Sequence, residues 1–330
     1  MRPEIGGRPT PRVPAITAVI PTLGRRDSLA RVLDRLESQT IAPAELAVYV
    51  VTDAAAEDGG RVAELAGERP YALRVLRGER PGASAARNAG WRAAETPLVL
   101  FLDDDVMPER ELVAQHLSWH ERHAEPEVGV LGLVRWADEL EVTPFMRWLE
   151  RGIQFDYPRI EPGADAGWGR FYTANASVKR AMLERVGGFD EESLPFGNED
   201  LDLALRMSRV GFRLLYNPAA RAEHLHRMDL DMWRRRVVRL AVAERRFLAM
   251  HPGDAEPYFH RLFTDAARRE RLRGRSVTAA RWVPPRTPVL GDYVWSRADL
   301  VFRQELADAF LQAWAADEAG EPVPGLDDAP

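Results

Sequence analysis

The stretch Phe101-Leu102-Asp103-Asp104-Asp105 places three carboxylates directly after a short apolar segment that starts at Pro97. This apolar segment is typical of a buried β-strand, so the carboxylates stand where that strand ends. On an extended backbone, Asp103 and Asp105 would project to one side and Asp104 to the other. Carboxylates packed together repel one another unless a cation or hydrogen-bond donors neutralise them. Oxygen-rich clusters suit Mg²⁺ or Mn²⁺, often with a substrate diphosphate as a further ligand, whereas the alternative is a solvated acidic turn.

The composition excludes several kinds of chemistry. The chain has 330 residues and a formal net charge of −6, which gives no overall case for binding nucleic acid. It contains no cysteine, so disulfides, thiol catalysis and cysteine-ligated zinc are excluded. No apolar run reaches the length of about eighteen residues needed to cross a bilayer, and residues 1–14 lack the apolar stretch of a signal peptide. We therefore expect a cytoplasmic protein.

The first half of the sequence alternates strand-like and helix-like segments. Repeated βα units with short connections predict a parallel sheet covered by helices on both faces. In such sheets ligands bind beyond the carboxyl ends of the strands, where Pro21-Thr22, Asp53 and the three aspartates fall. The expected strands are Ile16 to Ile20, Leu46 to Val51, Tyr71 to Leu76 and Pro97 to Leu102, and the expected helices run from Asp27 or Ser28 to Ser38, from Val62 to Ala66 and from Ser84 to Ala94.

Beyond Leu230 the pattern predicts helices almost throughout. Between His226 and Arg281 there are fourteen arginines against seven acidic residues, so this segment is basic. An apolar stripe favours a helical extension that packs on the sheet domain. The alternative is a peripheral surface for anionic lipid or for a lipid-linked acceptor. The stripe comprises Trp233, Val237, Leu240 and Leu248.

Further segments complete an ordered pattern. They are Gly82 to Gly90, Phe171 to Arg180, Val186 to Glu191, Asn198 to Arg206, and His224 with His226. In this order, the sequence resembles the family-2 glycosyltransferases of the GT-A fold. The resemblance implies an α/β fold with a mostly parallel, Rossmann-like sheet flanked by helices. It implies a GT-A catalytic domain (15–227). Composition and pattern predict a flexible segment before it (1–14), and a helical C-terminal extension (228–318) and a disordered tail (319–330) after it.

The resemblance also implies a donor pocket. Asp53 would accept a hydrogen bond from a uracil edge, although Thr52-Asp53-Ala54-Ala55 departs from the family's usual Asp-Asp-Gly-Ser-like sequence. Arg87 and Asn88 would lie on the nucleotide side of the donor pocket. Alternatively, they would cap the helix and bond loop carbonyl groups. Asn175 would line the sugar pocket, with Trp168 from the preceding loop. The donor-binding residues implied in this way are Pro21, Thr22, Asp53, Arg87, Asn88, Asp103, Asp104 and Asn175.

The metal ligands and the general base are assigned from the same resemblance. The resemblance implies Asp105 as the ligand of Mn²⁺ or Mg²⁺, with Asp104 as the weaker candidate, and His224 as a second ligand in preference to His226. A lone histidine is more often structural. Asp200 would be the general base on the acceptor hydroxyl, with Glu199 as the alternative base. The pair could instead complement the positive end of a helix.

These assignments predict a metal-dependent, inverting glycosyltransferase that moves a single sugar from a nucleotide-sugar donor to an acceptor hydroxyl. The Gln-x-x-Arg-Trp motif and membrane helices of processive family members are absent after Asp200. A UDP-sugar is the favoured donor, with GDP- and dTDP-sugars as alternatives, and the acceptor is a glycan, a lipid-linked or a small molecule. The rival functions are a sugar nucleotidyltransferase and an inactive nucleotide-sugar-binding module. No nucleic acid is expected as a partner, and contact with the inner face of the membrane is the alternative to a purely cytoplasmic location.

Overall fold

The computed structural model describes residues 14–56, 59–195, 197–271, 275–283, 287 and 289–326. The chain divides into two compact units, each discontinuous in sequence. The first contains residues 1–137, 160–191 and 203–225, and the second contains residues 138–159, 192–202 and 226–330. The expected helical extension thus shares a unit with two earlier segments. Nearly all of the expected flexible segment, and residues 327–330 of the expected tail, lie outside the described residues.

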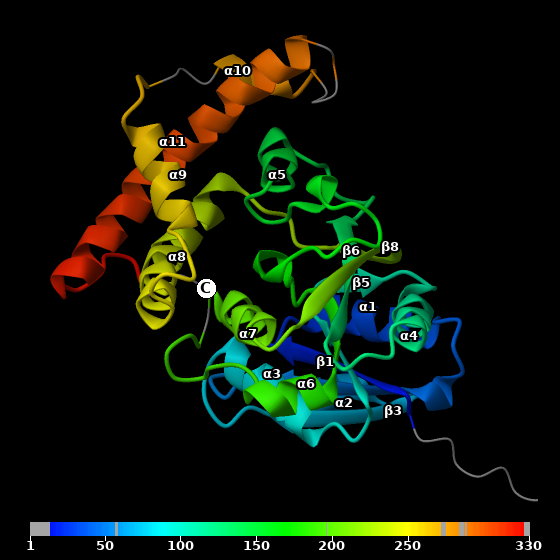
Figure 1. Cartoon of the computed structure of the whole chain (residues 1–330). Helices are drawn as coiled ribbons and strands as arrows, with labels where there is room; N and C mark the ends of the chain where they lie inside the picture. Colours follow the sequence, from blue (N-terminus) through cyan, green and yellow to red (C-terminus); the bar gives the residue numbers. More distant parts are fainter. Residues whose placement is uncertain are drawn as a thin grey trace, which may run out of the picture. The chain divides into compact units, whose positions relative to one another are not determined.

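The first unit is built on one sheet (Figure 1), and its described strands have the order β3-β2-β1-β4-β7-β6-β8-β5. Strands β3, β2, β1 and β4 are mutually parallel. Strand β7 is antiparallel to β4 and β6, β8 is parallel to β6, and β5 is antiparallel to β8. The predicted α/β fold with a mostly parallel sheet is confirmed. The strands are β1 (Ile16–Thr22), β2 (Leu46–Thr52), β3 (Ala72–Arg77), β4 (Leu98–Leu102), β5 (Val106–Pro108), β6 (Val128–Trp136), β7 (Asn175–Lys179) and β8 (Arg213–His224).

Helices cover this sheet. Helix α3 packs on β1, β2 and β3, and α4 packs on β6 and β8. Helix α1 buries the predicted apolar face, but it begins at Arg26 after Arg25, so the predicted cap at Asp27 or Ser28 was wrong. Asp27 lies instead in the first turn, where a carboxylate complements the positive end of the helix. The helices of this unit are α1 (Arg26–Glu37), α2 (Gly59–Ala66), α3 (Ala83–Ala93), α4 (Leu112–Arg122) and α6 (Arg180–Val186), joined by part of α7 (Glu199–Ser208).

The strand order reverses between β1 and β4. Strands β2 and β3 lie on one side of β1, and β4 lies on the other. Pairing of β1 with β4 ends at Val19 and Phe101, whereas β1 pairs with β2 as far as Thr22. Pro21 has no N–H to donate, and it stands beyond the last β1–β4 pair, where no ladder bond to β4 is lost. Open α/β sheets bind ligands at such a reversal point, which here adjoins the three aspartates.

A buried polar chain joins β7 to α4. Asn175, Ser177 and Lys179 alternate along β7 and so face the same side of the sheet. His116 and His120, one turn apart on α4, lie against them. His116 bonds Ser177 Oγ through Nδ1 at 2.8 Å and Asn175 Oδ1 through Nε2 at 2.9 Å. His120 bonds Ser177 Oγ through Nε2 at 2.8 Å, and Lys179 Nζ lies 3.1 Å from its Nδ1.

The partners fix the direction of every bond in this chain. The Lys179 ammonium has no acceptor atom, so it donates to His120 Nδ1. His120 Nε2–H then donates to Ser177, whose hydroxyl donates to His116 Nδ1, and His116 Nε2–H donates to Asn175 Oδ1. This sequence of bonds requires both histidines to be neutral. A proton added to either Nδ1 would face another donor.

Asn175 also holds the irregular part of the sheet. Its Nδ2 donates to the carbonyl oxygens of Ala220 at 2.9 Å and Leu133 at 3.3 Å. The register of β6 with β8 shifts between Gly132 and Leu133. A Cβ at Gly132 would collide with the Asn175 amide, so this position requires glycine. Asn175 pairs with Leu102, so the polar chain ends beside the residue that precedes the three aspartates.

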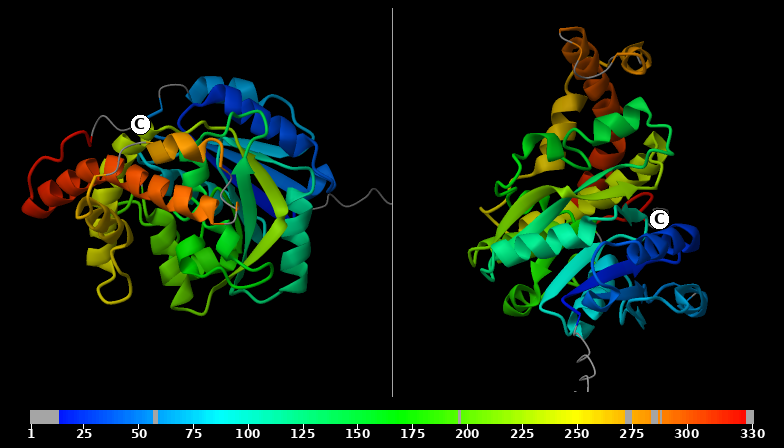
Figure 2. Two further views of the ribbon diagram at one scale, coloured as in Figure 1. Left: turned by 90° about the horizontal axis from the view of Figure 1, so that it is seen from above. Right: turned by 90° about the vertical axis from the view of Figure 1, so that its right-hand side faces the viewer.

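The second unit is helical. Helix α11 packs on α8, α9 and α10, and Figure 2 shows it as one long rod. Trp233 of the predicted stripe is buried against Phe145, which also packs on Phe302. Val237 and Leu240 are buried as well, whereas Leu248 is half-buried and Phe247 is buried beside it. The helices of this unit are α5 (Pro144–Leu149), α8 (Leu230–Met250), α9 (Tyr258–Ala267), α10 (Arg275–Ala280) and α11 (Leu290–Ala319).

The buried histidines make the fold sensitive to acid. Burial lowers the pKa of His116 to about 4, against a partial rise from its bond to Asn175. Burial and the Lys179 charge lower the pKa of His120 to about 2. An unfolded histidine has a pKa of about 6.5, so below that pH the unfolded chain binds protons that the folded chain does not. Stability contributed by the neutral histidines is therefore present above pH 6.5 and is lost as the pH falls towards 4.

We expect the free energy of unfolding to fall by on the order of 2 kcal/mol per buried histidine between pH 8 and pH 5. Chemical denaturation at several pH values measures this. His116→Gln should be less stable at pH 8 but should show a shallower decline on acidification, whereas the half-buried His123→Gln should keep the parental slope. An unchanged slope for His116→Gln would show that His116 does not carry the effect.

Candidate functional site

The three aspartates lie in a turn at the carboxyl end of β4. The strand ends at Leu102, the backbone turns at Asp104 and Asp105, and the amide of Val106 donates to the carbonyl of Asp103 at 3.2 Å. Asp104 and Asp105 share one guanidinium partner, whereas Asp103 pairs with another. The expectation that Asp103 and Asp105 project together from an extended strand was therefore wrong. That expectation assumed that side chains alternate between the two faces of an extended strand, and the turn ends this alternation.

Arg25 is the shared partner. Its Nη1 lies 2.5 Å from Asp105 Oδ2, and its Nη2 lies 2.8 Å from Asp104 Oδ1. Gly24, with a φ of +100°, turns the chain between the end of β1 and this residue. Thr22 completes the contact, because its hydroxyl donates to Asp104 Oδ2 at 2.6 Å and accepts from the Gly24 amide at 3.0 Å. The end of β1 is thereby bonded to the end of β4.

Burial dominates the electrostatics of Asp104. It raises the pKa of this carboxyl to about 6, although the Arg25 charge acts in the opposite direction. Burial also disfavours the charged form of Arg25, but the carboxylates of Asp105, Asp104 and Asp103 outweigh it and raise the pKa of Arg25. Asp103 is paired with Arg87 at 3.2 Å. With all groups ionised, the three carboxylates and two guanidiniums leave one negative charge uncompensated.

His224 lies beside this cluster. It is the last residue of β8, is buried, and contacts the ring of Trp136 edge-on. Its Nε2 is 3.9 Å from Asp105 Oδ1, and the Leu225 amide donates to the Asp105 carbonyl at 2.8 Å. The structure thus brings together the two predicted metal ligands. His226 is half-buried and lies in the segment that begins the last part of the second unit.

The donor set suits a cation that is shared with a substrate. Within the described ranges, no group of three or more acidic, histidine or cysteine side chains is placed to hold a metal ion. Mg²⁺ sites usually use one or two carboxylates and take further oxygens from substrate phosphates. Asp104 Oδ1 is also buried, and it already has a cationic neighbour in the Arg25 guanidinium, whose Nη2 lies 2.8 Å away.

Asp53 has a clear structural task. It is buried at the end of β2, where Oδ1 accepts from the Ala55 amide and Oδ2 from the Gly82 amide, each at 2.7 Å. Gly82 precedes α3 with a φ of +113°, so the carboxylate bonds two loops at the same edge of the sheet. Hydrogen bonding to a uracil edge stays a prediction, which would use the remaining lone pairs of these oxygens.

Arg87 and Asn88 lie on α3 but have different partners. Arg87 is buried against Phe189 and reaches Asp103. The Asn88 amide is fully buried, donating to the Phe189 carbonyl and Glu191 and accepting from Trp91 Nε1 and the Phe189 amide. These bonds fix the segment after α6. They are of the kind expected if Asn88 supports a loop, which was the alternative to nucleotide binding. Contact with the nucleotide stays a prediction for both residues.

Asn175 and Trp168 occupy different environments. The Asn175 side chain is fully buried and bonded to His116 and two carbonyl groups. Trp168 is half-buried at the start of the 3₁₀ helix η3 (Trp168–Arg170). A direct contact of either residue with a sugar stays a prediction. The bonds described above make Asn175 a support for the edge that carries Asp103.

Glu199 and Asp200 open helix α7, as predicted. Gly197 and Asn198 precede them with φ values of +86° and +59°, so the chain enters the helix through a tight left-handed turn. Two residues after Asp200, the Asp202 carboxylate lies 2.8 Å from His251 Nε2, and both side chains are buried. A Cβ on Gly197 would lie 3.0 Å from that of Ala243 on α8. Helix α8 and the residue after it thereby position the start of α7.

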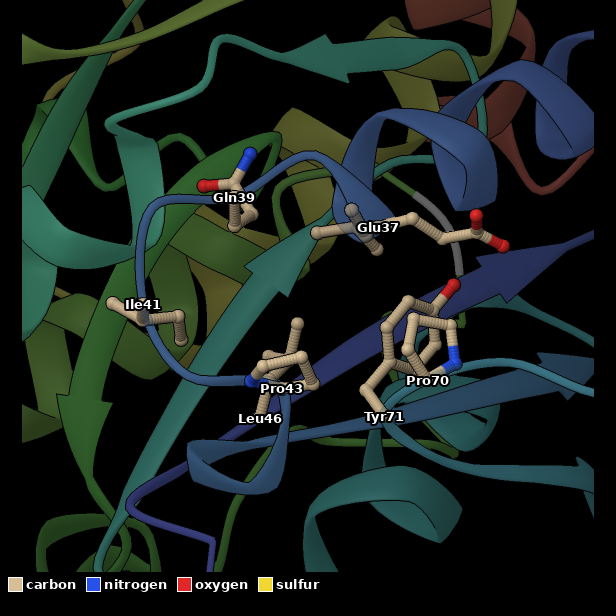
Figure 3. A pocket seen from close by; sticks show the side chains of 8 residues that line it. Glu37, Gln39, Ile41, Pro43, Leu46, Pro70 and Tyr71 are labelled. Carbon is tan, nitrogen blue, oxygen red and sulfur yellow. The ribbon is translucent and has the colours of Figure 1, made fainter.

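A small hollow at the opposite end of the strands does not belong to this site (Figure 3). It has a volume of about 10 Å³, which is no more than one water molecule requires. Leu46 begins β2 and Tyr71 precedes β3, so the hollow adjoins the amino ends of parallel strands. Its lining residues are Leu36, Glu37, Gln39, Ile41, Pro43, Leu46, Pro70 and Tyr71.

Three interacting residues of the structure were not predicted from the sequence. Arg25 was not proposed as a site residue, although it follows the first strand at the edge where the aspartates were expected. His116 and His120 were not connected to Asn175, because a long-range contact between a strand and a helix leaves no local signal. Arg25 could have been found from the sequence, because a positively charged residue after the first strand is expected to lie near aspartates at the end of a neighbouring strand.

The sequence profile described as "Glycosyltransferase like family 2" matches residues 13–243. The chain belongs to this family. A validoxylamine A glucosyltransferase from Streptomyces hygroscopicus subsp. limoneus is 30% identical over 234 residues, covering 61% of this chain and 49% of the relative. A pre-mycofactocin glycosyltransferase from Mycobacterium tuberculosis strain H37Rv is 30% identical over 179 residues, covering 53% and 37% respectively. The chain spans about half the length, or less, of these curated relatives.

Solved structures have the same fold. A mannosyltransferase from Pyrobaculum calidifontis in complex with GDP-Man and Mn²⁺ aligns with a TM-score of 0.54 at 21% identity, covering 98% of this chain and 80% of the other. TarS from S. aureus in complex with UDP-GlcNAc aligns with a TM-score of 0.52 at 15% identity, covering 93% and 92%. This family-2 chain thus has the predicted GT-A fold. In the part of this chain that the structure describes, no helix has the length and apolar character to traverse a bilayer.

Proposed function

We propose that this family-2 chain transfers a single sugar from a nucleotide-sugar donor to an acceptor hydroxyl, with inversion and with the help of a divalent cation. The observation that carries the proposal is the carboxylate cluster of Asp103, Asp104 and Asp105 at the reversal point of the sheet, beside His224. Anionic side chains at a phosphate-binding edge need a bridging cation. Family membership favours transfer over the rival nucleotidyl transfer.

The donor assignment follows from the same edge of the sheet. Asp105 and His224 would hold Mn²⁺ or Mg²⁺, which would offset the charge that develops on the departing nucleoside diphosphate. Thr22 and Asp53, at the ends of β1 and β2, are the proposed contacts to the nucleoside. A structural relative is complexed with GDP-Man and Mn²⁺ and another with UDP-GlcNAc, so UDP and GDP are the first donors to test.

Proton transfer is assigned to Asp200. Inversion in one step requires a base that accepts the proton of the attacking hydroxyl, and a carboxylate held at a helix start suits this role. The turn through Gly197 and Asn198 and the contact of Asp202 with His251 give the residue a fixed backbone. Glu199 is the alternative base. An inactive binding module would retain the donor residues but would not depend on this carboxylate.

Asp105→Ala should remove metal-dependent nucleotide binding and leave the fold intact. We expect the affinity for UDP or GDP in the presence of Mn²⁺ to fall by at least about tenfold, because the diphosphate loses its bridging cation. Titration calorimetry with Mn²⁺ and with EDTA measures this. Asp34→Asn is the control, since Asp34 also pairs with an arginine but its side chain is exposed on α1. Undiminished affinity in Asp105→Ala would refute the metal assignment.

Asp200→Asn keeps the shape of the side chain but removes its ability to accept a proton. We expect turnover to fall about 10²–10⁴-fold while donor affinity stays nearly unchanged. Steady-state rates and nucleotide titrations on the same preparations separate the two effects, and Asp229→Asn at the start of α8 serves as a control. Near-parental turnover would transfer the role to Glu199. NMR showing that the product retains the donor's anomeric configuration would contradict the inverting mechanism.

A further inference from the structure

Arg25 occupies the position of a cation at the donor site. Its two terminal nitrogens lie 2.5 Å from Asp105 Oδ2 and 2.8 Å from Asp104 Oδ1. Asp104 is almost completely buried and the Asp105 side chain is 7% exposed, whereas the Arg25 side chain is 48% exposed. A half-exposed, long side chain can leave this contact by rotating into solvent. The buried carboxylates cannot follow it, so they need another cation when it leaves.

We propose that Arg25 is the counter-ion of Asp105 in the donor-free protein and that it competes with the divalent cation for this carboxylate. The inference rests on the proposed metal-dependent transfer. The oxygen next to His224, Oδ1, and the oxygen that contacts Arg25, Oδ2, belong to the same carboxylate. A dication on Asp105 would therefore lie within a few ångströms of the guanidinium, where like charges repel strongly. The metal alone should bind weakly for this reason.

The diphosphate of a donor would relieve the repulsion between the divalent cation and the Arg25 guanidinium. The aspartate and arginine side chains of the cluster leave one negative charge, so a dication would turn the site positive. A diphosphate would then restore a negative balance and offer Arg25 new oxygen acceptors, since guanidinium groups pair well with phosphate. Metal and nucleotide are accordingly expected to bind cooperatively, with Arg25 exchanging Asp105 for the diphosphate. Arg25 is thus a positioning residue that makes metal binding depend on the donor.

Local structure supports this mobility. Arg25 is the N-cap of α1 and its carbonyl accepts from the Leu29 amide at 3.0 Å, so the exchange needs only a rotation of its side chain. Gly24 before it has nothing within 4 Å of a hypothetical Cβ, so there is open space at the turn. Thr22 bonds Asp104 independently of Arg25, so one buried carboxylate keeps a donor when the guanidinium moves. The exchange therefore leaves Asp105 as the carboxylate that is free to bind the metal.

The test measures binding of Mn²⁺ alone, by the decrease of the free-ion electron paramagnetic resonance signal. Arg25→Gln should bind Mn²⁺ about tenfold more tightly than the parent, because the competing charge is gone. Arg35→Gln removes the same charge from the last turn of α1 and should behave as the parent. Adding UDP or GDP should tighten Mn²⁺ binding strongly in the parent and much less in Arg25→Gln. Arg25→Lys, which keeps one positive charge without the two-pronged contact, should lie between them and replaces Arg25→Gln if that variant does not fold.

Two outcomes separate this inference from the proposed function. If Asp105→Asn abolishes Mn²⁺ binding but Arg25→Gln binds no more tightly than the parent, the metal assignment stands and the competition is wrong. If Asp105→Asn binds Mn²⁺ as the parent does, the metal assignment is wrong and the inference fails with it. A second readout is thermal stability in EDTA, where Arg25→Gln should melt below Arg35→Gln and should gain more from added Mn²⁺.

Discussion

The compensation of negative charge at the end of β4 is the constraint on which the site depends. Three successive aspartates leave a buried strand, and two of them are themselves buried. Such a cluster is stable only if cations or donors surround it. Arg25 from the end of β1, Arg87 from α3 and Thr22 supply these partners. Thr22 and Arg25 come from the β1–α1 unit and Arg87 from α3, so the same contacts that neutralise the carboxylates also fix the reversal point of the sheet.

A second set of polar bonds, along β7 and α4, supports the carboxyl end of β4. The bonds from Lys179 through His120, Ser177 and His116 end at Asn175, which stands opposite Leu102 in the β4–β7 pair. A buried polar network of this kind destabilises the fold when a member is missing, and it specifies a single packing arrangement when every member is bonded. Here every member has a partner and the direction of each bond is defined. The residue that precedes the aspartates is thereby paired with β7, one residue beyond the last β1–β4 pair at Phe101.

The fold was predictable from the sequence because its signal is local. The apolar runs at Ile16, Leu46 and Leu98 are separated by helical patterns of ordinary length, and short βα connections leave a parallel sheet as the natural arrangement. The pairing of Asp105 with His224 was predictable only through the resemblance to a family. The order of the antiparallel strands, the shared contact of Arg25 and the partner of Asn175 were not predictable. They depend on side chains brought together from distant parts of the chain, and on a turn at Asp104 that ends the strand alternation.

We propose that this edge of the sheet presents a nucleotide sugar for transfer. The most direct test is to incubate the full chain with a panel of UDP-, GDP- and dTDP-sugars and Mn²⁺, and to separate the products by anion-exchange chromatography. We expect free nucleoside diphosphate from at least one donor, through slow transfer of the sugar to water, and none in EDTA. Absence of nucleoside diphosphate from every donor, together with release of pyrophosphate from a nucleoside triphosphate and a sugar 1-phosphate, would contradict it.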